Sequence, residues 1–219
     1  MRLYVHGAGR SGRAAWPTRG EAAEVYVDHS AHADIQAKAD AVAQQAPDVP
    51  VVVVAHSLGA VVAALAARAG RIEVSRFVLV EPALYDFARG EPAIEIHIGT
   101  MTTARELAND GDLYGYWEIV SPMMFGRSAS RDRWAHERVF AARFCAVPQP
   151  WGHDVTVATF AQTPTLVVTG AWNDEYEAIA ARLSKAGAQH IQLPGFDHRP
   201  QDHPRFESVV SGFEQDPPT

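Results

Sequence analysis

An unbroken apolar run at residues 51–54 leads through a short turn into an alanine-rich stretch, residues 60–69, that contains no glycine or proline. A short apolar run bounded by a turn is typical of a buried strand, and the stretch after it is typical of a helix. The same alternation recurs along the chain. We therefore expect an α/β fold: a mostly parallel, doubly wound sheet with helices on both faces and right-handed crossovers.

The other expected strands are residues 2–5, 24–27, 76–80, 165–169 and 190–193, and the other expected helices are residues 34–45, 175–185 and 204–213. Residues 83–163 interrupt the alternation and are rich in aromatic and methionine side chains. Their only β-like alternation is at 93–98, whereas 103–109 and 131–144 have helical character. We expect one domain over residues 1–219, with a mainly helical insertion over about 83–163 at the carboxyl edge of the sheet.

Charge and composition exclude several classes of protein. The net charge of −7 and the absence of a Lys/Arg cluster argue against nucleic-acid binding, and no apolar run approaches the roughly 20 residues that cross a bilayer. One cysteine, Cys145, allows neither an internal disulfide nor a Cys-rich metal site. His29 and His32 have no carboxylate at zinc-site spacing, so no metal is expected. Residues 1–5 lead directly into a glycine turn rather than a signal peptide, which favours a cytoplasmic location.

Ser57 lies at the apex of the turn between the strand and the alanine-rich helix, within the sequence Ala-His-Ser-Leu-Gly at residues 55–59. A serine hydroxyl becomes a useful nucleophile only when it is exposed beside a base. A sharp strand-to-helix turn exposes it and places it at a helix N-terminus, where backbone N–H groups face developing negative charge. The alternative is an ordinary turn in which Ser57 caps the helix.

A second candidate element is the loop His-Gly-Ala-Gly at residues 6–9, which follows the first expected strand. Glycine lets a loop backbone approach a ligand closely, and ligands of open α/β sheets gather at the carboxyl ends of the strands. The N–H groups of Ala8 and Leu58 could together form an oxyanion hole. The alternative is a plain glycine-rich turn.

A base and an acid are needed to activate the serine. His198 lies on a polar loop after the last strand, and imidazole titrates near neutral pH, so we prefer it as the base over His203, which begins the last helix. Two carboxylates could orient the imidazole: Glu81 at the end of strand 76–80, and Asp174, which follows strand 165–169. Either could instead be a surface charge, and Asp174 could cap a helix.

This order of motifs, with a His-Gly loop, a serine elbow, an acid and then a histidine, resembles the α/β-hydrolase superfamily over nearly the whole chain. The resemblance implies that Ser57 is the nucleophile, that His198 is the base, and that Ala8 and Leu58 form the oxyanion hole. It implies that the insertion at about 83–163 is a cap that shapes the substrate pocket. It also implies a compact member that lacks the family's first two strands.

The chain departs from the family pattern at two places. Ala55 stands where the first glycine of the elbow is usual. The usual position of the acid, three residues after a glycine, holds Asn173, which cannot carry a negative charge. Some members place the acid at the end of the strand after the elbow helix, where Glu81 lies, so Glu81 and Asp174 both stay candidates.

We therefore predict a serine hydrolase, carboxylesterase-like, that cleaves an ester, thioester or lactone of a small, partly apolar molecule through an acyl-enzyme and without a cofactor. One alternative is a small-molecule binding protein on a hydrolase scaffold with little turnover. Another is a carbon–carbon hydrolase or an acyltransferase that uses the same triad. The sequence indicates neither the substrate nor the oligomeric state.

Overall fold

The computed structural model describes residues 1–17 and 24–216. The chain divides into two compact units, one drawn from residues 1–89 and 149–219 and the other from residues 90–148. The insertion expected at about 83–163 is longer than the second unit. Its outer parts belong to the first unit, where Asp86 accepts hydrogen bonds from the backbone N–H groups of Gly152 and His153, both at 2.8 Å.

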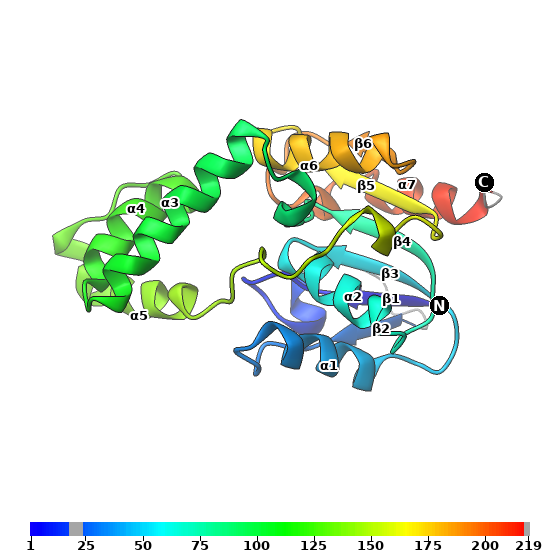
Figure 1. Ribbon diagram of the computed structural model, residues 1–219, viewed down its shortest axis with the longest axis horizontal. Coiled ribbons are helices and arrows are strands. Elements are labelled where there is room, and N and C mark those ends of the chain that lie inside the picture. The colour runs from blue at the N-terminus through cyan, green and yellow to red at the C-terminus, as the bar shows by residue number, and fades with distance from the viewer. Residues whose placement is uncertain (18–23, 217–219) are drawn as a thin grey trace. The chain divides into compact units, whose positions relative to one another are not determined.

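The first unit is built on a sheet whose six described strands are all parallel and follow the order β2-β1-β3-β4-β5-β6 (Figure 1). The strands are β1 (Arg2–Val5), β2 (Glu24–Val27), β3 (Val51–His56), β4 (Val74–Val80), β5 (Thr165–Thr169) and β6 (Gln189–Gln192). All strands that the sequence predicted are present, so the mostly parallel sheet is confirmed. Edge strand β6 is only partly buried, whereas β5 is buried throughout.

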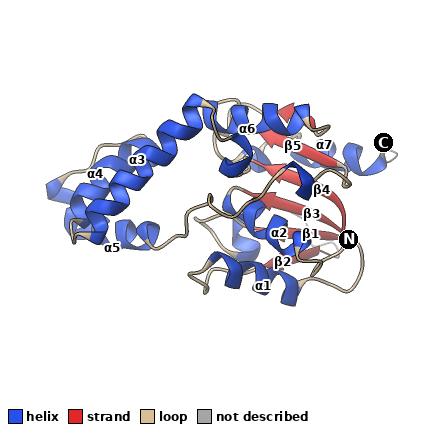
Figure 2. Cartoon of the chain, viewed as in Figure 1, coloured by secondary structure: helices blue, strands red, loops and turns tan. Residues whose placement is uncertain are grey.

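Helices cover both faces of the sheet, as expected (Figure 2). One face carries α1 (Ile35–Gln45), α2 (Leu58–Arg68) and α6 (Asp174–Lys185), and the other carries α7 (Phe206–Gln215) and a 3-10 turn at Gly12–Ala15. The chain moves the same way across the sheet from β2 to β3, from β3 to β4 and from β5 to β6. Right-handed crossovers then place α1, α2 and α6 on one face. On the other face, Trp16 and Phe206 join the side chains of β1, β3, β4 and β5 in a buried core.

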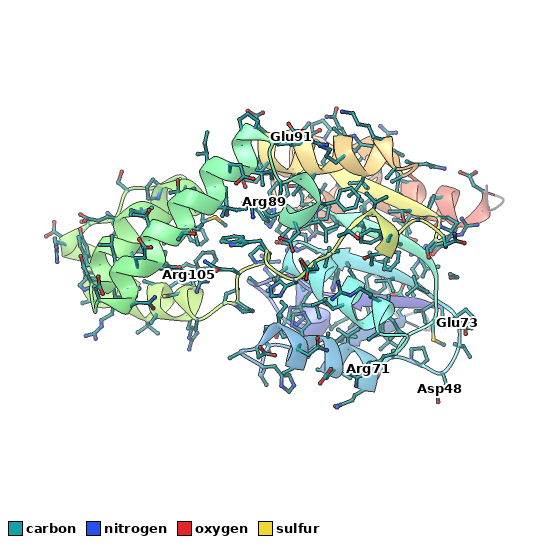
Figure 3. The ribbon with its side chains drawn as sticks, viewed as in Figure 1. Asp48, Arg71, Glu73, Arg89, Glu91 and Arg105 are labelled. Carbon is teal, nitrogen blue, oxygen red and sulfur yellow. The ribbon has the colours of Figure 1, made fainter. Side chains whose placement is uncertain are left out.

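The second unit, residues 90–148, contains α3 (Pro92–Asn109), α4 (Leu113–Phe125) and α5 (Trp134–Cys145). The β-like interpretation of residues 93–98 is wrong, because that segment is the first part of α3. Ile94 and Met101 are buried while Ile96 is exposed, which is the spacing of one helix face rather than of a strand. Arg105 projects from α3 and donates hydrogen bonds to the carbonyl oxygens of Cys145, at 3.0 Å, and of Val147 (Figure 3).

Trp117 lies at the centre of the second unit and is fully buried. Its indole N–H donates to Glu137 at 2.7 Å, and Arg133 binds the other oxygen of the same carboxylate, also at 2.7 Å.

Among the described residues of the whole chain, no helix has both the length and the apolarity that crossing a bilayer requires.

Candidate active site

The register of the sheet brings the carboxyl ends of four strands together. Val5 of β1 pairs with Ala55 of β3, and Val80 of β4 pairs with both His56 of β3 and Val168 of β5. The residues that follow β1, β3, β4 and β5 therefore meet at one edge of the sheet. This is the edge where ligands of open α/β sheets bind.

Ser57 occupies a strained elbow between β3 and α2. Its φ of 53° and ψ of −124° are unusual for a residue with a side chain, and its hydroxyl makes no capping hydrogen bond to α2. The alternative of a capping serine is therefore not what the structure contains. Gly59 is required here, because a Cβ at that position would lie 2.5 Å from the carbonyl oxygens of Val5 and His6. Ala55, by contrast, is simply buried in β3.

Two backbone N–H groups flank Ser57. Leu58 is the first residue of α2, and Ala8 is exposed in the loop after β1. That loop runs against the elbow, since a Cβ at Gly7 would lie 3.0 Å from Cβ of Ser57. Within residues 1–17 and 24–216, neither the N–H of Ala8 nor that of Leu58 has an acceptor. Both donors are thus available at the edge of the sheet that carries Ser57.

Glu81 follows β4 and is fully buried. Its carboxylate accepts hydrogen bonds from the N–H of Gly170 at 2.6 Å and from the indole N–H of Trp172 at 3.0 Å. Nδ1 of His198 lies 3.4 Å from Oε2 of the same carboxylate. A buried charge is costly unless it is paired, and these three donors account for the burial of Glu81.

Asn173 and Asp174 lie at the start of α6. Oδ1 of Asn173 accepts a hydrogen bond from the N–H of Glu175 at 2.7 Å, which makes Asn173 the N-cap of the helix. Asp174 is the first helical residue and is exposed to solvent. In the described part of the chain, therefore, the structure brings Glu81 to His198 and does not bring Asp174 there.

The loop that carries His198 is held by a second histidine. Nε2–H of His56 donates to the carbonyl oxygen of His198 at 2.8 Å, and the two rings lie 4.7 Å apart between centroids. Burial, and then the proximity of His198, hold the pKa of His56 well below its usual value. His56 therefore stays neutral. The His198 ring also stacks on Tyr176, with centroids 5.0 Å apart and planes inclined by 29°.

The remaining histidines have structural surroundings. Nδ1 of His203 accepts the backbone N–H of Arg205 at 3.0 Å, just before α7. His29 is buried and stacks on His6 at 3.8 Å, and its Nε2–H donates to the carbonyl oxygen of His6 at 2.9 Å. His32 is exposed. Over the described residues, no group of three or more His, Cys, Asp or Glu side chains is arranged to hold a metal.

Backbone strain is concentrated around the site. Five described residues other than glycine have positive φ, and four of them lie here: Ser57, Glu81, Ala171 and Asp197. Such strain persists only where the surrounding structure enforces it, and it clusters at functional sites. Gly170 adds a steric requirement, because a Cβ there would lie 2.1 Å from the carbonyl oxygen of Asp197. The loop of His198 approaches β5 only because residue 170 is glycine.

Sequence reasoning did not single out His56, Gly170, Trp172 or Tyr176 as site residues. Gly170 carried a signal, since it follows an expected strand and no side chain is tolerated where two backbones meet. His56 carried a signal as well, because it is adjacent to Ser57 in the sequence. Trp172 and Tyr176 carried no signal, because aromatic residues near the start of a helix most often pack a core.

A parallel sheet with a serine elbow after β3, a buried carboxylate after β4 and a histidine after the last strand defines an α/β hydrolase. The family model described as "Serine aminopeptidase, S33" (Hydrolase_4) matches residues 3–139, which is more than half of the chain. The chain therefore belongs to this family of α/β hydrolases.

Solved structures share the fold at low sequence identity. A hydrolase from Oleispira antarctica, olei00960, is 13% identical with a TM-score of 0.62, over 98% of this chain and 91% of that one. MGS-M2, an α/β hydrolase from a Medee basin deep-sea metagenome library, is 15% identical with a TM-score of 0.60, over 100% and 90%. An esterase from Thermogutta terrifontis is 20% identical with a TM-score of 0.56, over 98% and 88%. A search of curated proteins found no match.

Proposed function

We propose that this protein is a serine hydrolase that cleaves an ester, thioester or lactone of a small, partly apolar molecule. Ser57 is the nucleophile, His198 the general base and Glu81 the acid that orients His198. The N–H groups of Ala8 and Leu58 form the oxyanion hole.

The observation that carries this proposal is the contact between Nδ1 of His198 and the buried carboxylate of Glu81, 3.4 Å long. A proton on Nδ1 that faces Glu81 leaves Nε2 unprotonated and able to accept the hydroxyl proton of Ser57. The carboxylate also stabilises the imidazolium that then forms. Hydrogen bonds at an active site are often long before a substrate binds, and 3.4 Å is compatible with that.

The reaction follows from these roles. The oxygen of Ser57 attacks the substrate carbonyl as His198 takes the serine proton. The negative oxygen of the tetrahedral intermediate accepts hydrogen bonds from the N–H groups of Ala8 and Leu58. Each such donor typically lowers the barrier by about 3 kcal/mol. His198 next gives its proton to the leaving group. Water, activated by the same base, then hydrolyses the acyl-enzyme.

Exposed aromatic side chains and two structural neighbours support this substrate class. Trp172 and Phe196 are 42% and 40% exposed and lie in the segments that hold Glu81 and His198. One neighbour is the Thermogutta terrifontis esterase. Another is Est816, described as an N-acyl homoserine lactone degrading enzyme, which is 16% identical with a TM-score of 0.56 over 97% of this chain and 92% of that one.

Hydrolysis of p-nitrophenyl acetate and butyrate tests the proposal, with Ser57→Ala as the inactive variant and the exposed Ser208→Ala as the matched control. We expect the Ser57 variant to lose at least about 10³-fold in kcat, as removal of a nucleophile usually does. Ser208→Ala should match the wild type. Equal rates for the wild type and Ser57→Ala would refute the proposal.

Labelling by a fluorophosphonate probe separates the hydrolase from a binding protein. A hydrolase is labelled at Ser57, whereas folded protein that stays unlabelled would indicate a binding protein with little turnover. Product analysis in the presence of alcohol acceptors detects acyl transfer. An amino-acid p-nitroanilide, included because of the family's description, detects peptidase activity.

A further inference from the structure

Two buried tyrosines adjoin the proposed triad but have no part in it. Tyr85 lies in a 3-10 turn, Tyr85–Ala88, and is 2% exposed; Tyr176 lies in the first turn of α6 and is 5% exposed. The 3-10 turn packs against α6, so the segments that carry the two tyrosines are in contact. A buried hydroxyl needs a hydrogen-bond partner, and one partner of the Tyr176 hydroxyl is Ser57.

A chain of hydrogen bonds connects Glu175 to Ser57. The hydroxyl of Tyr85 donates to Oε2 of Glu175 at 2.8 Å. Hydrogen bonds also join the hydroxyl of Tyr176 to those of Tyr85 and Ser57. A carboxylate can only accept, so the proton of Tyr85 is committed to Glu175 and its oxygen is left to accept from Tyr176.

The hydrogen bond between Tyr176 and Ser57 can reverse its direction during the reaction. A tyrosine hydroxyl both donates and accepts, so Tyr176 can accept a hydrogen bond from the hydroxyl of Ser57 at rest and donate one to the serine oxygen later. Loss of the hydrogen bond from Tyr176 to Tyr85 costs little free energy, since the hydroxyl of Tyr85 keeps its hydrogen bond to Glu175. Burial raises the pKa of both Tyr85 and Tyr176 above the usual range, so both hydroxyls stay protonated at neutral pH.

We propose that Tyr176 is a further catalytic residue, which donates a hydrogen bond to the oxygen of Ser57 as His198 removes its proton, and that Tyr85 and Glu175 position it. In this step the O–H bond of Ser57 breaks and an N–H bond forms at Nε2 of His198. The proton of Tyr176 stays on its own oxygen. This inference rests on the proposed role of Ser57 as nucleophile.

The ring of Tyr176 has a separate effect, which the test must hold constant. It stacks on the imidazole of His198, with centroids 5.0 Å apart. Tyr176→Phe keeps this stacking and removes only the hydroxyl. A matched control is Tyr116→Phe in the second unit, because Tyr116 is fully buried there and its hydroxyl has no hydrogen-bond partner among the described residues.

The test measures kcat and KM for p-nitrophenyl butyrate, and the rate constant of fluorophosphonate labelling, on folded protein checked by thermal unfolding. We expect Tyr176→Phe to lower kcat and the labelling rate constant by about tenfold, with KM within about twofold of the wild type, because one neutral hydrogen bond to the reacting oxygen is lost. Tyr116→Phe should match the wild type in both. The pH midpoint of kcat should not move, since Tyr176 does not titrate in the assay range.

Tyr85 provides the second arm of the test. If it acts only through Tyr176, Tyr85→Phe should lower kcat about threefold, and the double variant should be no slower than Tyr176→Phe alone. Additive losses would overturn the positioning role of Tyr85.

The inference as a whole is overturned if Tyr176→Phe keeps wild-type kcat and labelling while Ser57→Ala is inactive, or if the pH midpoint shifts. Failure of the proposed function looks different, because wild-type protein would then be neither labelled nor active.

Discussion

Replacement of Glu81 by glutamine removes the negative charge that faces His198 and keeps the size of the side chain. At 3.4 Å, a carboxylate and an imidazolium attract one another by about 5 kcal/mol at an effective dielectric constant of about 20. The His198 side chain is 34% exposed, so solvent screens part of this attraction, and we take about 3 kcal/mol as the loss in the transition state. That loss corresponds to a roughly 100-fold lower kcat.

Glutamine also creates a conflict in the buried site. Both oxygens of Glu81 accept hydrogen bonds, from Gly170, Trp172 and His198, and the amide nitrogen of glutamine would have to face one of these donors. Unpaired buried donors cost about 1–3 kcal/mol, so the variant should unfold at a lower temperature than the wild type. Kinetics must therefore be measured well below its unfolding midpoint.

The assay is steady-state hydrolysis of p-nitrophenyl butyrate, with circular dichroism to verify folding. The matched control is Asp174→Asn, which removes an exposed carboxylate that the structure does not bring to His198. We expect this control to stay within about twofold of wild-type kcat, since exposed charges contribute little. The reasoning is refuted if folded Glu81→Gln keeps kcat within about threefold, or if Asp174→Asn loses as much.

Two further predictions concern glycine and histidine. Gly170→Ala should abolish activity and lower the free energy of unfolding by roughly 3 kcal/mol or more, because its Cβ would lie 2.1 Å from the carbonyl oxygen of Asp197. The denaturation control is Gly99→Ala, whose Cβ would meet no atom within 4 Å apart from its chain neighbours and the backbone of its own helix. Equal stability of the two variants would contradict this prediction. Burial and the neighbouring His6 lower the pKa of His29 to about 3. The unfolded chain, with a pKa near 6.5, then binds more protons below that pH, so stability falls as pH falls, by about 2 kcal/mol from His29 at pH 5. Urea denaturation at pH 7 and pH 5 should show a smaller decrease for His29→Gln, and an unchanged pH slope would exclude this cause.

Local sequence patterns were sufficient for most of the sheet and its helices. Apolar runs bounded by turns predicted β1 to β5, because burial in a parallel sheet favours continuous apolar side chains. Edge strand β6, expected at residues 190–193, has the sequence Gln-His-Ile-Gln and is only partly buried. Local patterns misled at residues 93–98, where alternation over only six residues also fits a helix whose buried face includes Ile94.

The sequence by itself determined the fold class and proposed Ser57, His198 and the N–H groups of Ala8 and Leu58, because each of these depends on the few residues around it. It left Glu81 and Asp174 as alternatives, since the choice depends on which carboxylate the sheet register and the His198 loop bring together. Only the tertiary structure showed that Glu81 lies 3.4 Å from His198, whereas Asn173 and Asp174 begin α6. The contact of Tyr176 with His198 has the same origin, because it joins side chains that no local pattern relates.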